Sequence, residues 1–147
     1  MTAPLLPPTV LTAPVLTDDE TLIATFTPDR LTYWRAHVIM AVALGAAVGL
    51  LLLWQGNPYP VMGPIGAALA IAARAAYVAS EALTDLWYLT SRRLIGPRGL
   101  TVPRAQIATA RAFLGSVQIT TTAGDRHLIK YLSNPAADAA RLTQALR

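Results

Sequence analysis

The sequence has no cysteine, which excludes disulfide bonds and thiolate metal sites and fits a globular part in the cytoplasm. Charge is scarce as well, because Asp, Glu, Lys and Arg together make up 14% of the 147 residues. Hydrophobic residues make up 54%, and the mean hydropathy is +0.43. This balance is unusual for a soluble domain and indicates an integral membrane protein.

The signatures of catalysis are also missing. The sequence has no glycine-rich phosphate loop and no HExxH, GxSxG or CxxC pattern. Only three acidic residues follow position 84, which leaves no convincing acid–base pair there. Nucleic-acid binding needs a basic face with interleaved aromatic residues, and Phe113 and Tyr131 are too few. We therefore expect no enzyme, no metal or cofactor, and no nucleic-acid partner.

The apolar residues are concentrated in two stretches. Ala36 to Trp54 is a run of 19 residues without charge, and Pro60 to Ala73 is a second uncharged stretch. About 20 apolar residues are needed to cross ~30 Å of hydrocarbon as a helix, so the second stretch suffices only if Arg74 is tolerated near its end. A cleaved signal peptide is disfavoured because acidic residues 18–20 precede the first run. The sequence therefore predicts a transmembrane hairpin within 31–84, with helices over about 31–54 and 60–80.

Two features of the hairpin predict its orientation. Tyr33 and Trp34 lie at one end and Trp54 and Tyr59 at the other, as in the aromatic belts of membrane proteins. The turn at 55–60 carries no charge. Arginines lie at the opposite end, at Arg30, Arg35, Arg92, Arg93, Arg98 and Arg104. By the positive-inside rule, we expect a multi-pass protein of the bacterial inner membrane with both termini in the cytoplasm.

Residues 1–30 form an N-terminal segment with its own composition. In residues 1–19, four prolines among Leu, Val and Thr exclude a helix and favour an extended chain, which either packs on a partner or is disordered. Residues 20–27 (ETLIATFT) are typical of a short strand, which Pro28 ends. Four acids and one base give this segment a net charge of −3.

Residues 85–147 form a cytoplasmic module, in which nine bases and three acids give a net charge of +6. Turns that contain glycine, at 96–99, 114–115 and 123–125, separate short strand-like stretches of an antiparallel sheet. These stretches are Trp87 to Ile95, Leu100 to Val102, Ile107 to Phe113, Val117 to Thr122 and His127 to Leu132. Asn134-Pro135, followed by apolar residues at helical spacing, predicts an amphipathic C-terminal helix.

Several of these motifs resemble the bacterial PH-like domain membrane proteins, in which a two-helix hairpin precedes a small PH-like module. The resemblance covers 20–147 and rests on LTSRRLI at 89–95, LGSVQITT at 114–121 and Asn134-Pro135 before the last helix. It implies a small split-barrel sheet capped by the C-terminal helix, with a core completed by the 20–28 strand or by a partner. It implies no activity, although some members resemble assembly or accessory factors of photosynthetic or respiratory membrane complexes.

Two sets of residues are candidates for binding a partner protein. Gly45 and Gly49 form a GxxxG pattern, which either packs the two helices on each other or docks the hairpin on another membrane protein. Arg74, Glu81 and Asp85 lie within about 40° of one helical face, and Arg74 lies ~9 Å from the inner interface. A charge at that depth snorkels inward towards Glu81 or Asp85, contacts a partner subunit, or belongs to a proton or ion pathway.

A third set of candidates is basic. Arg92, Arg93, Arg98 and Arg104 either bind anionic lipid headgroups or only determine the topology. His37, at the edge of the first helix, is either a polar anchor or a haem or pigment ligand.

From these features we expect a non-catalytic accessory or assembly subunit of a larger bioenergetic membrane complex. It would dock through its hairpin and its N-terminal tail. The alternatives are a membrane-surface module that binds anionic lipid and a homo-oligomeric scaffold.

Overall fold

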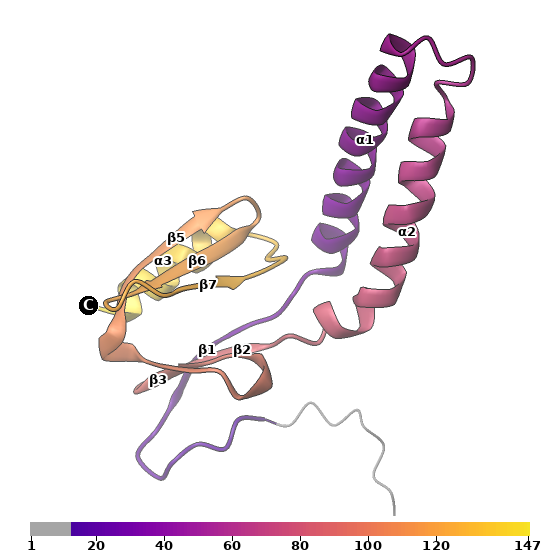
Figure 1. Cartoon of the computed structure of the whole chain (residues 1–147). Helices are drawn as coiled ribbons and strands as arrows, with labels where there is room; N and C mark the ends of the chain where they lie inside the picture. The colour runs from indigo at the N-terminus through magenta and orange to yellow at the C-terminus, as the bar shows by residue number, and fades with distance from the viewer. Residues whose placement is uncertain (1–12) are drawn as a thin grey trace, which may run out of the picture.

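The computed structural model describes residues 13–147, so Pro4, Pro7 and Pro8 of the N-terminal tail lie outside the described residues. The chain forms a helical hairpin and a β module, which lies at the base of the hairpin where α1 begins and α2 ends (Figure 1). The strand β1 (Leu22–Phe26) precedes the hairpin, and the other strands follow it. The hairpin is therefore inserted between two strands of the module.

The hairpin consists of α1 (Arg30–Trp54) and α2 (Met62–Ala82), which pack against each other. Asp29 caps α1, since its carboxylate accepts a hydrogen bond from the Thr32 N–H at 2.7 Å. With 25 and 21 residues, the helices are ~37 and ~31 Å long. Both are long and apolar enough to cross a membrane, by length and composition. The prediction of two long apolar helices packed as a hairpin is confirmed.

Close approach of the two helices depends on small residues where they meet. Gly45 and Gly49 of α1 are buried against Gly63 and Pro64 of α2. A Cβ atom at Gly63 would lie 2.7 Å from the backbone nitrogen of Gly49, so no side chain fits there. The GxxxG pattern thus packs the hairpin on itself, which is one of the two alternatives. Most large side chains of α1 and α2 point outward, Leu50 among them, and form an exposed apolar surface.

The strands of the module form two antiparallel sheets, with the orders β1-β2-β3-β4 and β5-β6-β7. After the hairpin come β2 (Trp87–Thr90), β3 (Arg93–Ile95), β4 (Thr101–Pro103), β5 (Ile107–Phe113), β6 (Ser116–Thr121) and β7 (Arg126–Ile129). The strand before the hairpin pairs with the strand after it, so that Phe26 lies opposite Trp87. The sheet that follows the hairpin is therefore completed by a strand that precedes it.

The stretch from Trp87 to Ile95 is two strands rather than one, which corrects the prediction from sequence. The chain turns back at Ser91-Arg92, and Leu89 pairs with Leu94. Thr90 supports the turn, because its hydroxyl oxygen accepts a hydrogen bond from the Arg93 N–H at 3.0 Å. The stretch contains no glycine or proline, the residues that most clearly mark a turn in a sequence.

One hydrophobic core joins both sheets to the C-terminal helix α3 (Pro135–Ala145). Alternate residues of β6 are buried, as predicted for a half-buried antiparallel strand. The predicted cap of α3 is also confirmed, since the Asn134 side chain accepts a hydrogen bond from the Ala137 N–H at 3.2 Å. The core side chains are Phe26, Trp87, Leu89, Leu94, Val102, Ile107, Val117, Ile119, Ile129, Leu132, Ala139 and Leu142.

Candidate functional site

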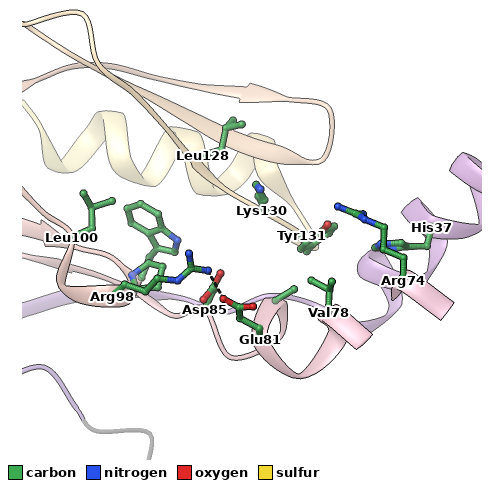
Figure 2. Close-up of a pocket in the computed structure, with 13 residues that line it drawn as sticks. His37, Arg74, Val78, Glu81, Asp85, Arg98, Leu100, Leu128, Lys130 and Tyr131 are labelled. Carbon is green, nitrogen blue, oxygen red and sulfur yellow. Dashed lines mark hydrogen bonds and ion pairs between the residues drawn. The ribbon is translucent and has the colours of Figure 1, made fainter. Parts of the chain in front are cut away.

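A cavity of about 380 Å³ lies where the hairpin meets the module. Figure 2 shows the side chains around it. They come from both helices, from the connection after α2 and the start of β2, from the loop after β3, and from β7 and the segment that follows it. The charged and aromatic residues of the lining are His37, Arg74, Glu81, Asp85, Trp87, Arg98, Lys130 and Tyr131. The fold thus brings together polar groups that are up to 94 positions apart in the sequence.

Tyr33 joins α1, α2 and the module beside this cavity. Its side chain is fully buried, and its hydroxyl donates a hydrogen bond to the Ala75 C=O of α2 at 2.7 Å. Its ring meets the Tyr131 ring edge-on, with centroids 4.9 Å apart. In addition, the Asp29 N–H donates a hydrogen bond to the Tyr131 C=O at 2.6 Å. The module is therefore packed against the hairpin at this point as well as being connected to it by the chain.

Burial of Tyr33 departs from the expected aromatic belt, whereas Trp34, Trp54 and Tyr59 are exposed as that expectation requires. His37 is buried beside Tyr33, with ring centroids 4.2 Å apart. Its Nδ1 lies 2.8 Å from the Tyr33 C=O, and because a carbonyl only accepts, Nδ1 is the donor. Among residues 13–147, no three His, Asp or Glu side chains come together as potential metal ligands.

Arg74, Glu81 and Asp85 all line the cavity, but they are not paired with one another as the sequence suggested. Glu81 instead forms an ion pair with Arg98, with 2.6 Å between Oε1 and Nη2. Arg74 and Glu81 are two helical turns, or ~10 Å, apart along α2, and the loop after β3 brings Arg98 closer. Within residues 13–147, neither Arg74 nor Lys130 forms an ion pair.

Asp85 lies beyond the end of α2 at Ala82, so it does not share the helical face assumed from sequence. The connecting segment nevertheless places it in the same cavity. Burial raises the pKa of the Asp85 carboxyl, and the nearby positive charges of Arg98 and Lys130 oppose this shift. The cavity therefore contains a carboxyl group whose charged form is partly disfavoured.

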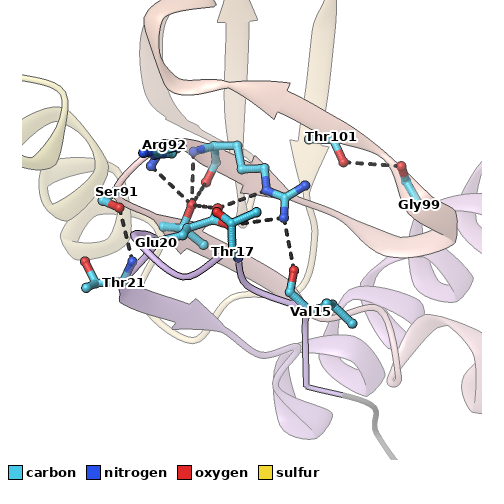
Figure 3. A network of polar contacts seen from close by, with 10 residues as sticks. Val15, Thr17, Glu20, Thr21, Ser91, Arg92, Gly99 and Thr101 are labelled. Carbon is cyan, nitrogen blue, oxygen red and sulfur yellow. Dashed lines mark hydrogen bonds and ion pairs between the residues drawn. The ribbon is translucent and has the colours of Figure 1, made fainter.

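Two arginines of the basic set, Arg92 and Arg93, pair with acids that precede the hairpin. Glu20 lies at the centre of a network of polar contacts (Figure 3). Its side chain is 1% exposed and forms an ion pair with Arg93 at 2.9 Å. The hydrogen bonds from Arg93 and from the Thr90 hydroxyl lower the pKa of the Glu20 carboxyl to about 2. Arg92 forms a second, exposed ion pair with Asp19 at 2.8 Å.

The four arginines proposed as lipid contacts thus have partners inside the protein. Three of them pair with acids, and Arg104 donates a hydrogen bond to the Ser91 C=O at 3.3 Å. The net charge of 85–147 does not reveal these pairs, because Asp19, Glu20 and Glu81 precede that part of the sequence. Complementary clusters, acidic at 18–20 and basic at 92–93, were the available signal.

Three of the charged and aromatic residues of the lining were not candidates from sequence, namely Trp87, Lys130 and Tyr131. Tyr131 takes a left-handed backbone conformation with φ 59°, which no glycine or asparagine marks in the sequence. Figure 2 shows Arg74 and Lys130 on either side of Tyr131. Two cations that form no ion pair among the described residues make this end of the cavity suitable for an anionic group.

Comparison of the chain with protein-family models, curated proteins and solved structures gives no match. The resemblance to bacterial PH-like membrane proteins therefore stays a hypothesis based on short motifs.

Proposed function

We propose that this chain is a non-catalytic accessory or assembly subunit of a larger bioenergetic complex, photosynthetic or respiratory, in the bacterial inner membrane. The hairpin crosses the membrane twice, both termini are cytoplasmic, and the module is a PH-like split barrel at the cytoplasmic face. The apolar outer surface of α1 and α2 supports the membrane placement. The uncharged turn and the arginines at the base of the hairpin support this orientation.

Arg74 is the main support for docking on another subunit. It is an exposed side chain eight residues before the end of α2, hence ~12 Å inside the cytoplasmic end of the helix. The neighbouring Ala75 is level with Tyr33 in the first turn of α1, so Arg74 lies near the cytoplasmic interface, where a cation is stabilised by a polar group that meets it. No acid within residues 13–147 pairs with it. A carboxylate on a helix of another subunit would meet this need.

The test is purification of the full chain from its native membranes in mild detergent, followed by native mass measurement. The parent chain should carry a stoichiometric partner of another sequence. Arg74→Leu should retain about tenfold less of it, because a polar contact between membrane helices is worth roughly 1–2 kcal/mol. Arg141→Leu, an exposed arginine on α3, is the matched control and should retain the partner.

A lone monomer would contradict the proposal. A homo-oligomer with no other subunit would contradict it as well, and would support the scaffold alternative. Equal loss of the partner in Arg74→Leu and Arg141→Leu would show that the arginine in α2 is not the contact.

One observation favours anionic lipid as a second ligand, namely the pair of cations, Arg74 and Lys130, in the cavity. In lipid nanodiscs, phosphatidylglycerol should raise the Tm of the full chain, because a ligand that binds only the folded state stabilises it. High salt should weaken the effect, and Lys130→Ala should remove most of it. Arg126→Ala, at the other end of β7, is the control. A Tm that does not depend on anionic lipid would exclude this function.

A further inference from the structure

The turn between β5 and β6 carries the most exposed apolar side chain of the module. Leu114 is 90% exposed and Phe113 is 53% exposed. All residues from 111 to 115 are exposed, whereas Val117, two residues further on, is fully buried. The tip of this strand pair therefore projects beyond the core and takes no part in it.

The backbone of the turn does not explain why a leucine stands there. Leu114 and Gly115 both have positive φ, 44° and 78°, in a two-residue turn that closes with Phe113 opposite Ser116. Such turns favour Asn or Asp followed by Gly, and left-handed backbone is unfavourable for a leucine. Leu114 is therefore unfavourable for the turn conformation and contributes nothing to the core. This indicates that its side chain contacts something outside the protein.

The tip lies beside the first turns of α1. A second cavity, of about 400 Å³, is lined by Leu114, Gly115 and Ser116 on one side and by residues of α1 on the other. The residues of α1 are Thr32, Arg35, Ala36 and Ile39. Figure 1 shows this end of the β5–β6 pair directed towards the lower part of α1. The turn is held there, since the Leu132 N–H donates a hydrogen bond to the Gly115 C=O at 3.2 Å.

The surroundings of the tip combine apolar and basic side chains. On α1, Val38 and Ile39 are each 61% exposed, so the apolar surface of the helix continues to the level of the tip. Arg35 and Lys130 line the same cavity as Leu114, and Arg111 precedes the tip on β5. Apolar side chains flanked by cations are suited to the boundary between lipid headgroups and acyl chains.

We infer that Phe113 and Leu114 insert into the cytoplasmic headgroup–acyl boundary of the bilayer that the hairpin crosses. The inference rests on the membrane placement given under Proposed function, but it does not need a partner subunit. The module then contacts the membrane at a second point, away from the two chain connections to the hairpin. Its orientation on the bilayer is fixed by the helices and the tip together.

The absence of cysteine allows a direct test with single-cysteine variants of the full chain. Leu114→Cys carries an environment-sensitive fluorophore at the tip, and Leu50→Cys reports on the apolar surface of α1 near the hairpin turn. Ala123→Cys, in the turn between β6 and β7, is the control at the opposite end of β6, ~20 Å away. The purified variants are reconstituted in phosphatidylcholine–phosphatidylglycerol bilayers with and without a lipid-attached quencher.

The label at 114 should emit at shorter wavelength and be quenched by the lipid quencher, as should the label at 50, while the label at 123 should not. Quenching at 50 without quenching at 114 would overturn the inference and leave the membrane placement intact. Shielding of 114 only in native membranes would also overturn it, because a protein would then cover the tip. If the label at position 50 emits at the wavelength seen in water and is not quenched by the lipid quencher, the membrane placement itself is overturned.

A second variant separates insertion from folding. Leu114→Asn suits the turn better, so the module should fold at least as well as the parent. With a label at Phe113→Cys, this variant should lose most of the lipid quenching, whereas Ala123→Asn should keep it. Unchanged quenching in Leu114→Asn would contradict the role of Leu114.

Discussion

The rings of Tyr33 and Tyr131 meet edge-on at the base of the hairpin, with centroids 4.9 Å apart and planes at 70°. Tyr33 belongs to α1, and Tyr131 follows the last strand of the module, so this contact spans the two parts of the chain. The Tyr33 hydroxyl also reaches α2 through the Ala75 C=O. A shift of either helix should therefore also shift the module, because Tyr33 contacts both helices and Tyr131.

Removal of the Tyr33 side chain should loosen the module from the hairpin. Tyr33→Phe keeps the ring contact and loses one hydrogen bond, at a cost of about 1 kcal/mol in free energy of unfolding. Tyr33→Ala loses the whole buried ring, at a cost of about 3–5 kcal/mol. Tyr33→Ala should also speed protease cleavage in the 83–86 connection. Tyr59→Ala, at the exposed hairpin turn, is the control and should change neither result.

The contact between the two helices should tolerate an added methyl group at Gly66 but not at Gly63, three residues earlier on α2. Gly63→Ala places a Cβ atom 2.7 Å from the Gly49 backbone nitrogen, so the helices must separate, at a cost of about 1–3 kcal/mol. Gly66→Ala, on the same helix, meets nothing within 4 Å. Thermal unfolding in detergent should show a lower Tm for Gly63→Ala alone. Similar Tm values for both variants would show that this helix contact is not tight.

The strand before the hairpin should be essential to the module. Phe26 is 2% exposed in the core, so Phe26→Ala should cost about 3–5 kcal/mol, whereas Leu22→Ala on the same strand, 46% exposed, should cost far less. A fragment of residues 85–147 lacks β1 and should fail to fold by near-UV circular dichroism. Addition of a peptide of residues 13–28 should restore the signal. A folded 85–147 fragment would show that β1 is dispensable.

Local patterns predicted much of this fold. Long apolar runs predicted α1 and α2, alternation predicted β6, and the Asn134-Pro135 pair predicted the start of α3. Each of these signals arises from residues that are close in sequence, where the periodicity of a helix or a strand determines which side chains are buried.

The contacts of the site were harder to predict because they join distant residues. Glu20 and Arg93 are 73 positions apart, and their pairing depends on β1 lying beside β2. The end of α2 at Ala82 moved Asp85 off the helical face that the periodicity assumed. Arg98 reaches Glu81 only because the chain reverses at Ser91-Arg92, a turn that lacks the usual residues.

Glu20 should make the stability of the protein depend on pH in the acid range. Its pKa is about 2 in the folded protein, below the ordinary value of 4.5, because Arg93 and Thr90 donate hydrogen bonds to its charged form. The folded state therefore binds this proton less readily than the unfolded state does. The contribution of Glu20 to stability is fully present above pH 4.5 and is lost as the pH falls from 4.5 towards 2.

Glu20→Gln should therefore lower the Tm at pH 7 and flatten the decline of Tm between pH 4.5 and pH 2. The matched control is Asp19→Asn, which removes the neighbouring ion pair to Arg92, where both side chains are more than half exposed. Exposed pairs contribute little to stability, so this variant should follow the pH dependence of the parent. Thermal unfolding of the full chain in detergent, measured across this pH range, distinguishes Glu20→Gln from Asp19→Asn. If the Tm of Glu20→Gln declines as steeply as that of the parent, the acid sensitivity belongs to other carboxylates. The network around Glu20 would then contribute no proton linkage.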